Sequence, residues 1–398
     1  MYRSLQVFAR SPMSFARLVL LLLAAQGAVL ASPRATAAEP TWRTTRSQHF
    51  TAIGNASDGR LREVLVRLEQ FREVLRRVSP GLNLTPSQPI MVVVFDDKRS
   101  LAPFAPLYEG RPIDVGGLYV GGAATHFMAL DVGRGPAAYS VVFHEFSHLF
   151  LRNTLADVPV WFNEGLAGFY ETFELSGGNR NVTIGLANGV YVEKLRERML
   201  PLDELLAVTP ASPLYNEGDR RSIFYAQSWA LTHYLLVGNP ERARQLPVYL
   251  QALIDGLDEP AAFANAFGAT TSQLAAELAE YVRRMTFTAV RYNLALGIDD
   301  SAIPKSQPLS DADASAILAE LQCMVKRKDE ARARLDAALG RAPDHVALLR
   351  TRALFDVLDE RPGDALAILE PLVADPSADA STLELAARAH LSPRADLI

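Results

Sequence analysis

Apolar positions in the first third of the chain follow two different spacings, and each spacing predicts a different element. Compact apolar runs at residues 48–53, 90–95, 116–120 and 125–131 predict short strands. Residues 59–78 instead carry apolar side chains at every third or fourth position, which predicts an amphipathic helix. We therefore expect the folded chain to begin with a small sheet and one or two helices.

Helical spacing dominates the chain after Pro136, which stands where helices favour proline, in the first turn. A break that contains Pro159 separates the first two expected helices. The expected elements are helices at 137–152 and 161–173, a short strand at 182–185, and a region that is helical throughout from 202 to about 294 and best formed at 222–236.

Residues 310–398 contain an internal repeat with a period of 34 residues. The repeated pairs are Ala331 and Ala365, Leu335 and Leu369, Leu349 and Leu383, and Ala353 and Ala387. This period, with small residues where helices cross, resembles tetratricopeptide repeats, in which helix pairs stack on one another. The alternative is a helical bundle rich in alanine and leucine.

The N-terminus has the features of a secretory signal. Three arginines precede an apolar run at 18–31, and cleavage sites of the Ala-x-Ala kind follow at 35–37 or 29–31. The run is shorter than the ~20 residues that a membrane-spanning helix needs. We expect a cleaved signal peptide at 1–38 and a periplasmic or secreted protein, with an uncleaved membrane anchor as the alternative.

Composition and charge narrow the class of function. The 398 residues, 49% hydrophobic and 21% charged, suit a globular protein of two or three domains. Without the four arginines of the signal, the 45 acidic residues exceed the 36 remaining basic ones by nine. We expect no nucleic-acid partner, because phosphate binding needs a basic face. Cys323 is the only cysteine, which excludes an intrachain disulfide and a zinc site built from several cysteines.

The central chemical feature is an H-E-x-x-H motif, formed by His144-Glu145-Phe146-Ser147-His148. Residues four apart lie on one helix face, so both imidazoles can reach one metal ion while Glu145 approaches the metal-bound water. Apolar residues flank the motif on both sides, and burying these ionisable groups would be costly unless a cation used them. The alternative is two buried histidines that bond to the backbone.

A third ligand is expected from the next helix. Fifteen residues separate His148 from Glu164, enough for one helix to end and a second to return antiparallel to it. The stretch HEFSH … WFNEGLAGFYE resembles the gluzincin metallopeptidases and, among them, the peptidase MA-like family, which is often exported and joined to tetratricopeptide repeats. The resemblance implies that His144, His148 and Glu164 hold one zinc ion per chain and that Glu145 is the general base.

Three protein ligands leave zinc a fourth position for water, which the ion acidifies. Glu145 would accept the proton and pass it to the leaving amine. Tyr225 and His233, eight residues apart on the predicted helix 222–236, are candidates to stabilise the charged intermediate. Glu171, two turns after Glu164, is a candidate to accept a hydrogen bond from a ligating imidazole.

The resemblance also bears on how substrate binds. In gluzincins the strand before the catalytic helix lines the cleft and pairs with extended peptide; here that strand is 125–131, which carries His126. Asn163 precedes the third ligand and is a candidate to fix the start of its helix or to contact substrate. With Glu171 it is expected to surround the metal ligands. Related aminopeptidases grip a free amino terminus with a G-x-M-E-N stretch that residues 121–125 lack, so we expect an endopeptidase.

We therefore predict an α+β protein in which a zincin-like metallopeptidase precedes an all-α repeat region that resembles tetratricopeptide repeats. The predicted boundaries are a signal peptide at 1–38, a peptidase domain at 39–300 (α/β lobe 39–135, catalytic helices 136–175, helical lobe 176–300) and repeats at 310–398. The expected partners are a peptide or protein substrate and a protein docked on the repeats. Two alternatives are a binding protein with a vestigial or structural metal site, against which the intact Glu145 argues, and a zinc hydrolase that acts on a non-protein amide.

Overall fold

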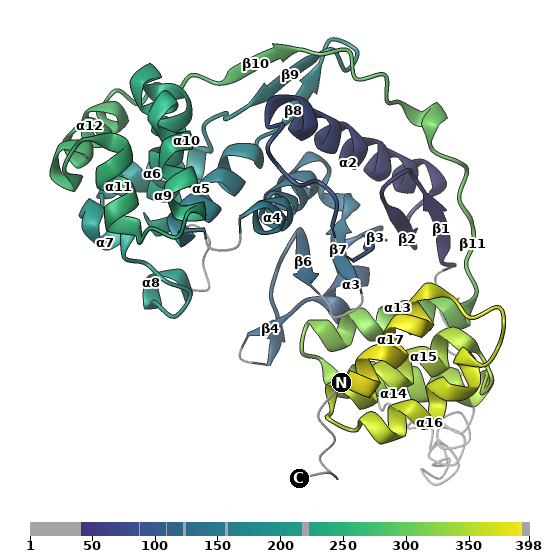
Figure 1. Cartoon of the computed structure of the whole chain (residues 1–398). Coiled ribbons are helices and arrows are strands. Elements are labelled where there is room, and N and C mark those ends of the chain that lie inside the picture. Colours follow the sequence, from purple (N-terminus) through teal and green to yellow (C-terminus); the bar gives the residue numbers. More distant parts are fainter. Residues whose placement is uncertain are drawn as a thin grey trace, which may run out of the picture. The chain divides into compact units, whose positions relative to one another are not determined.

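A mixed sheet forms the centre of the N-terminal part (Figure 1). The computed structural model describes residues 41–391 except 87, 109, 122–124, 156–157 and 217–222, so the predicted signal peptide lies outside the described residues. The strand order is β11-β1-β2-β3-β7-β6, and β2, β3 and β7 run parallel to one another. The strands are β1 (Arg43–Arg46), β2 (Thr51–Gly54), β3 (Ile90–Phe95), β6 (Gly117–Gly121), β7 (His126–Asp131) and β11 (Gln307–Pro308).

Both faces of this sheet are covered, because alternate side chains of a strand point to opposite sides. In β3, Val92 and Val94 join one apolar core, while Val93 and Phe95 join a second. The helices that supply the first core are α2 (Asp58–Val78) and α4 (Pro136–Thr154). Short elements complete this part: α3 (Lys98–Leu101), 3₁₀ turns at Ala102–Phe104 and Val132–Arg134, and the hairpin of β4 (Leu107–Tyr108) and β5 (Arg111–Pro112).

A group of helices follows α4, as the sequence predicts. The helices are α5 (Val160–Tyr170), α6 (Gly189–Glu197), α7 (Leu202–Leu206), α8 (Pro213–Asn216), α9 (Ile223–His233), α10 (Pro240–Ile254), α11 (Glu259–Phe267) and α12 (Thr271–Arg283). The expectation of helix throughout 202–294 is wrong at its end, because Val290–Asn293 forms strand β10. This strand pairs with β9 (Asn181–Ile184), which also pairs with β8 (Glu174–Ser176). The mixed α and β content predicted from the sequence is confirmed.

The C-terminal helices repeat at the interval found in the sequence. Helices α14 (Lys328–Arg341) and α16 (Pro362–Val373) begin 34 residues apart, as do α15 (Val346–Leu358) and α17 (Ala380–Leu391). Helix α13 (Asp311–Met324) precedes them and takes a different role. None of the helices in the described part of the chain is both long and apolar enough to cross a membrane.

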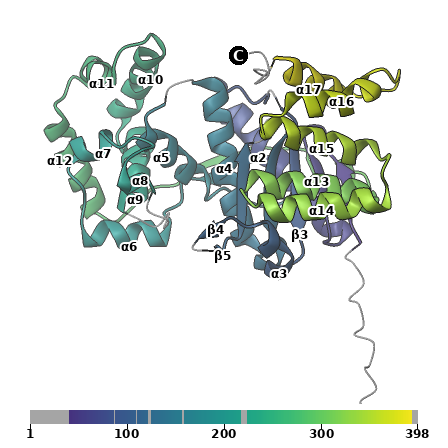
Figure 2. The same cartoon turned by 90° about the horizontal axis from the view of Figure 1, so that it is seen from below.

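Helix α13 covers the second face of the central sheet (Figure 2). Leu318 and Leu321 pack with Val93 and Phe95 of β3 in one buried cluster. Just beyond the helix, the Arg327 guanidinium donates to the backbone carbonyl of Ala102 at 2.9 Å. The first helix of the C-terminal region is therefore a layer of the sheet domain.

Helix α5 lies in close contact with α9, and Gly165 makes this contact possible. A side chain at position 165 would collide with the Thr232 hydroxyl and the Ser228 carbonyl oxygen of α9. Glycine at this position therefore brings the backbones of the two helices together, immediately after Glu164.

We expect Gly165→Ala to lower the free energy of unfolding by about 1–3 kcal/mol, because overpacking forces two buried helices apart. Denaturant titration measures this change. Gly340→Ala in α14 is the matched control, since a side chain there meets no atom within 4 Å and alanine is the better helix former. Equal stability of the parent and Gly165→Ala would contradict the packing argument.

Candidate metal centre

Helix α4 carries the H-E-x-x-H motif. A glycine sets where the helix begins, and aromatic contacts set which face of the helix is buried. Gly135 precedes the helix with a φ of 62°, a conformation that glycine adopts without strain. On the buried side, the Phe143 ring lies 4.6 Å from Phe71 of α2, and Phe146 lies 5.3 Å from Phe50. These aromatic contacts hold the helix so that its histidines face α5.

Three side chains converge where α4 meets α5. The His144 Nε2 atom lies 3.3 Å from the Glu164 Oε2 atom, and the His148 Nε2 atom lies 3.4 Å from the same oxygen. All three side chains are buried, with 4–8% of each residue exposed. The structure thus brings together the three residues that the motif and the next helix suggested, and they form a group that could hold a metal ion.

The outer nitrogen of each imidazole is held by an oxygen. The His144 Nδ1 atom lies 3.0 Å from the Glu171 carboxylate, and the His148 Nδ1 atom lies 2.9 Å from the Asn163 side-chain oxygen. Carboxylate and amide oxygens accept hydrogen bonds, so both Nδ1 atoms carry the proton. With Nδ1 as the donor, the Nε2 atom of each neutral imidazole is the one available to a metal ion, and it faces Glu164. Asn163 lies inside α5 rather than at its start, which follows Pro159.

Burial and hydrogen bonding act in opposite directions on the pKa values of this group. Burial opposes a charge on His144, but hydrogen bonds to Glu164 and Glu171 outweigh it and raise the pKa of His144. Burial likewise opposes ionisation of Glu164, yet hydrogen bonds from both imidazoles hold its pKa below the usual value. A divalent cation could take the place of these hydrogen bonds, because it stabilises the carboxylate and accepts both imidazoles in their neutral form.

The two spacings from Glu164 to the imidazoles match those of a tetrahedral metal site. Two atoms bound to one ion at about 2.0–2.1 Å with tetrahedral angles lie about 3.3–3.4 Å apart. Glu164 stands at 3.3 and 3.4 Å from its two partners. Two imidazoles and one carboxylate suit divalent ions of the later first transition series. The Glu164 oxygen therefore lies where it could bind such an ion together with the imidazoles.

Glu145 follows His144 and is buried, with 6% of the residue exposed. Helix geometry turns its position on α4 by about 100° from that of His144, so it lies beside the face that carries the histidines. Burial raises the pKa of Tyr119 on β6, and the nearby charges of Arg152 and Glu145 act on it in opposite directions. Glu145 therefore lies near Tyr119 of strand β6.

Tyr215 of α8 also contacts the group, and no sequence pattern pointed to it. Its hydroxyl donates to the Glu164 Oε1 atom at 3.1 Å, which leaves Oε2 facing the two imidazoles. Tyr225, a candidate from the sequence, contacts Tyr215 instead: its hydroxyl donates to the Tyr215 carbonyl oxygen at 3.4 Å, and the two rings stack. The structure therefore places Tyr225 next to Tyr215, the residue that contacts Glu164, and the role of Tyr225 toward the charged intermediate stays a prediction.

The expectation that His233 belongs to the site is wrong. The residue is fully buried in α9. Its Nε2 atom lies 3.0 Å from the Gly185 carbonyl oxygen, and the Tyr281 hydroxyl lies 2.8 Å from its Nδ1 atom. Burial lowers the pKa of His233 to about 4. His233 is therefore a neutral core residue that joins α9, α12 and the loop after β9.

The strand expected to line the cleft also needs correction. Strand β7, which begins at His126, is paired on both sides, with β3 and with β6. Strand β6 is the edge of the sheet instead, and its Tyr119 hydroxyl lies 2.9 Å from the His126 Nδ1 atom. Only an edge strand has free backbone groups for an added peptide. Any peptide paired with this side of the sheet must therefore lie along β6.

We expect Glu171→Ala to weaken metal binding by about 10–100-fold, the usual effect of removing the partner of a ligating histidine. The variant leaves the His144 Nδ1 proton without its acceptor. Competition with a chromophoric chelator measures the affinity. Glu193→Ala, an exposed acid on α6, is the control, and equal affinity in both variants would count against the proposed support.

Comparison with known proteins relates the site, rather than the whole chain, to one family. A family described as "Protein of unknown function (DUF1570)" matches residues 138–251. No curated protein shows a significant match to the sequence. The matched stretch contains every residue of the buried group and its partners: His144, Glu145, His148, Asn163, Glu164, Glu171 and Tyr215.

Proposed function

We propose that this chain is an exported zinc-dependent metallopeptidase of the gluzincin type, and more specifically an endopeptidase. The observation that carries the proposal is the convergence of the Nε2 atoms of His144 and His148 on one oxygen of Glu164, at 3.3 and 3.4 Å. A peptidase also needs a base, which Glu145 supplies on the same helix. An unused carboxylate would be costly at a buried structural metal site.

Zinc is the ion that suits this group best. Two imidazoles and one carboxylate are the ligand set of catalytic zinc in peptidases, and they leave one coordination position open. When bound, zinc would lower the pKa of a water molecule toward 7 and polarise the carbonyl group of the substrate. Glu171 and Asn163 keep the imidazoles in the tautomer that offers Nε2 to the ion.

The remaining steps belong to side chains and backbone of this chain. Glu145 would take a proton from the attacking water and deliver it to the leaving amine. Tyr215 fixes the second oxygen of Glu164, so that this carboxylate keeps its orientation. The open edge of β6 would bind the substrate backbone as an added strand, beside Glu145. An extended peptide is therefore the class of substrate that we assign.

The finer description of the fold belongs to the same proposal. The order of elements along the chain, edge strand β6, strand β7, α4 and α5, supports a zincin-like peptidase domain. Helices α6 to α12 would form its second lobe. The 34-residue interval between successive helix pairs supports tetratricopeptide-like repeats after α13. Export rests on the N-terminal sequence pattern alone.

The proposal is tested with the mature chain, loaded with one equivalent of zinc, on an unbiased peptide library read by mass spectrometry. We expect internal cleavage that stops after treatment with a chelator and returns when zinc is restored. A chain that holds zinc tightly but cleaves no peptide would overturn the peptidase function and favour the binding-protein alternative.

A further inference from the structure

The Glu171 carboxylate, which holds the His144 imidazole, is itself held by a residue outside the two ligand helices. Its Oε2 atom lies 3.0 Å from the His144 Nδ1 atom, and its Oε1 atom accepts a hydrogen bond from the Asn188 side-chain nitrogen at 2.7 Å. In the described part of the chain, this carboxylate makes no other hydrogen bond. Asn188 therefore reaches the metal centre through one intermediate side chain.

The orientation of the Asn188 amide follows from its two partners. Its Oδ1 atom accepts a hydrogen bond from the Val190 backbone N–H at 3.0 Å, which caps the start of α6. A backbone N–H can only donate, so the amide oxygen faces Val190 and the amide nitrogen faces Glu171. One side chain thus caps a helix and donates to the carboxylate that holds a candidate metal ligand.

The loop that carries Asn188 is fixed at both ends. Gly185 follows β9 with a φ of 71°, and a side chain there would collide with the Phe169 ring of α5. Its backbone N–H donates to the Phe169 carbonyl oxygen at 3.0 Å, and its own carbonyl oxygen lies 3.0 Å from the His233 Nε2 atom of α9. Contacts with α5 and α9 therefore hold the start of the loop, and the cap of α6 holds its end.

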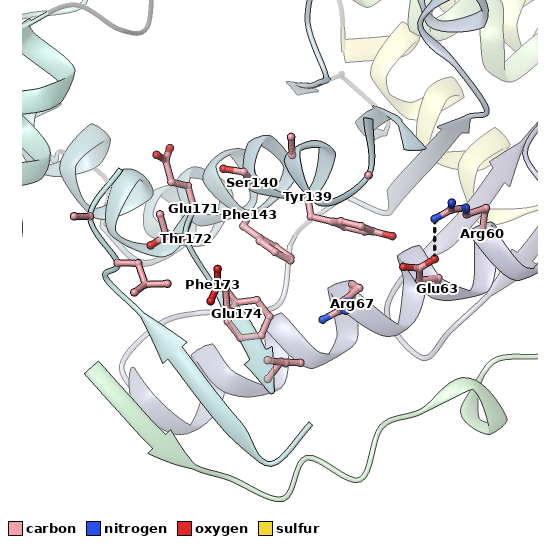
Figure 3. Close-up of a pocket in the computed structure, with 15 residues that line it drawn as sticks. Arg60, Glu63, Arg67, Tyr139, Ser140, Phe143, Glu171, Thr172, Phe173 and Glu174 are labelled. Atoms are coloured by element: carbon pink, nitrogen blue, oxygen red, sulfur yellow. Dashed lines mark hydrogen bonds and ion pairs between the residues drawn. The ribbon is translucent and has the colours of Figure 1, made fainter. Parts of the chain in front are cut away.

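Glu171 has space to turn away from His144 unless another group holds it. A pocket of about 650 Å³ borders Glu171 and extends between the N-terminal half of α4, helix α2 and the residues that follow α5 (Figure 3). In Figure 3 the Glu171 side chain lies at one end of this pocket, near Ser140 and Phe143 of α4. A side chain that borders open space has other rotamers available. A rotamer that turned into the pocket would give up the bond to His144.

The hydrogen bond from Asn188 opposes such a rotation. It engages the oxygen that His144 does not use, so both contacts of Glu171 are made in the same rotamer. Holding a group in its bonding conformation before a ligand arrives increases affinity, because less conformational entropy is lost on binding. The contribution should be smaller than that of Glu171 itself, which contacts the imidazole directly.

We propose that Asn188 is a positioning residue of the metal centre, whose side-chain amide keeps the Glu171 carboxylate turned toward His144 and away from the pocket. The inference rests on the metal site of the function proposed above and adds to it a residue from the loop before α6. In the described part of the chain, no hydrogen bond joins Asn188 to a candidate ligand, so it acts through Glu171.

Asn188→Ser separates the two roles of this side chain. Serine also caps helices, since its hydroxyl can accept the Val190 N–H, but it has no amide nitrogen to offer Glu171. Asn239→Ser is the matched control. Asn239 caps the start of α10 in the same way, and its side-chain nitrogen donates to the Tyr234 hydroxyl at 3.0 Å. Each variant keeps a cap and loses one hydrogen bond to a neighbouring side chain.

Zinc affinity is measured on the mature chain by competition with a chromophoric chelator, without any peptide. We expect Asn188→Ser to bind zinc about 3- to 10-fold more weakly than the parent, the equivalent of one hydrogen bond, and Asn239→Ser to match the parent. The two metal-free variants should unfold at the same denaturant midpoint. Asn188→Asp keeps the size of the side chain but faces Glu171 with a second carboxylate, so it should also weaken zinc binding.

Two further measurements separate positioning from general support of the fold. In a Glu171→Ala chain, Asn188→Ser should cause no additional loss of zinc affinity, because the residue through which Asn188 acts is already absent. The visible spectrum of the cobalt-loaded chain depends on the arrangement of the ligands. It should change in Asn188→Ser in the same direction as in Glu171→Ala, and Asn239→Ser should have the spectrum of the parent.

Zinc affinity equal to that of the parent in both Asn188 variants would overturn the positioning role while leaving the metal site and the peptidase function in place. Additive losses in the double variant would also overturn it, because Asn188 would then act by a route that does not include Glu171. A parent chain that binds no zinc would overturn the proposed function and this inference together. If the parent binds zinc but cleaves no peptide, only the peptidase function fails, and the zinc affinities still decide the role of Asn188.

Discussion

Glu145→Gln is expected to lower kcat for peptide cleavage by about 10²–10⁴-fold, the contribution of a general base, while zinc stays at one ion per chain. Glutamine keeps the shape of the side chain but cannot accept a proton at neutral pH. Glu145 is not one of the three converging groups, so metal binding does not depend on it. Turnover of a quenched peptide and metal analysis on the same preparation measure both quantities.

Glu193→Gln is the matched control for this substitution, because it makes the same chemical change on the exposed face of α6. It should cleave at the rate of the parent. A Glu145→Gln chain that is as active as the parent would exclude Glu145 as the base. If the parent and Glu145→Gln both fail to cleave peptide while both keep their zinc, the result would instead support a structural metal.

Glu164→Ala is expected to lose the metal itself. The substitution removes the oxygen on which both imidazoles converge, leaving two nitrogen ligands. The loss of affinity should exceed the ~100-fold upper limit for removing an outer partner of a ligand. Metal that binds only the folded chain adds about 2.7 kcal/mol of stability at 100 times its Kd. A chelator should therefore lower the Tm of the parent but not that of the variant.

The pair of variants separates two roles that one activity assay would merge. Both lose cleavage, but only Glu164→Ala should lose zinc in competition with a chromophoric chelator. Glu145→Gln is the control in this comparison, because it also removes a buried carboxylate but leaves the three candidate ligands in place. Tight binding of one zinc by Glu164→Ala would show that Glu164 is no ligand, and the gluzincin proposal would then fail.

The sequence predicted the residues whose spacing is set by helix geometry. His144 and His148 lie one turn apart, and a loop of sufficient length brings Glu164 to them, so both relations follow from local rules. Glu171 lies two turns beyond Glu164 in sequence and close enough to reach His144. In each of these cases the partners lie on α4, on α5 or at the end of α5, so they are close in the sequence.

Contacts that depend on tertiary packing could not be predicted in this way. Tyr215 lies 51 residues from Glu164 in a helix of four residues, with no motif around it. Helix α9 is buried on all sides, so its apolar pattern could not indicate which face Tyr225 and His233 present to the site. The position of β6 at the sheet edge is likewise a matter of strand order, which alternation of apolar residues does not specify.

The cover that α13 provides sets a lower limit on how far this chain can be shortened. A version that ends before residue 311 would leave Val93, Phe95 and Phe127 of the central sheet in contact with water. Exposed apolar sheet surface of this kind makes molecules adhere to one another. We therefore expect that a shortened version suitable for work in solution must still include α13 and Val325, even for work that concerns the candidate metal centre alone.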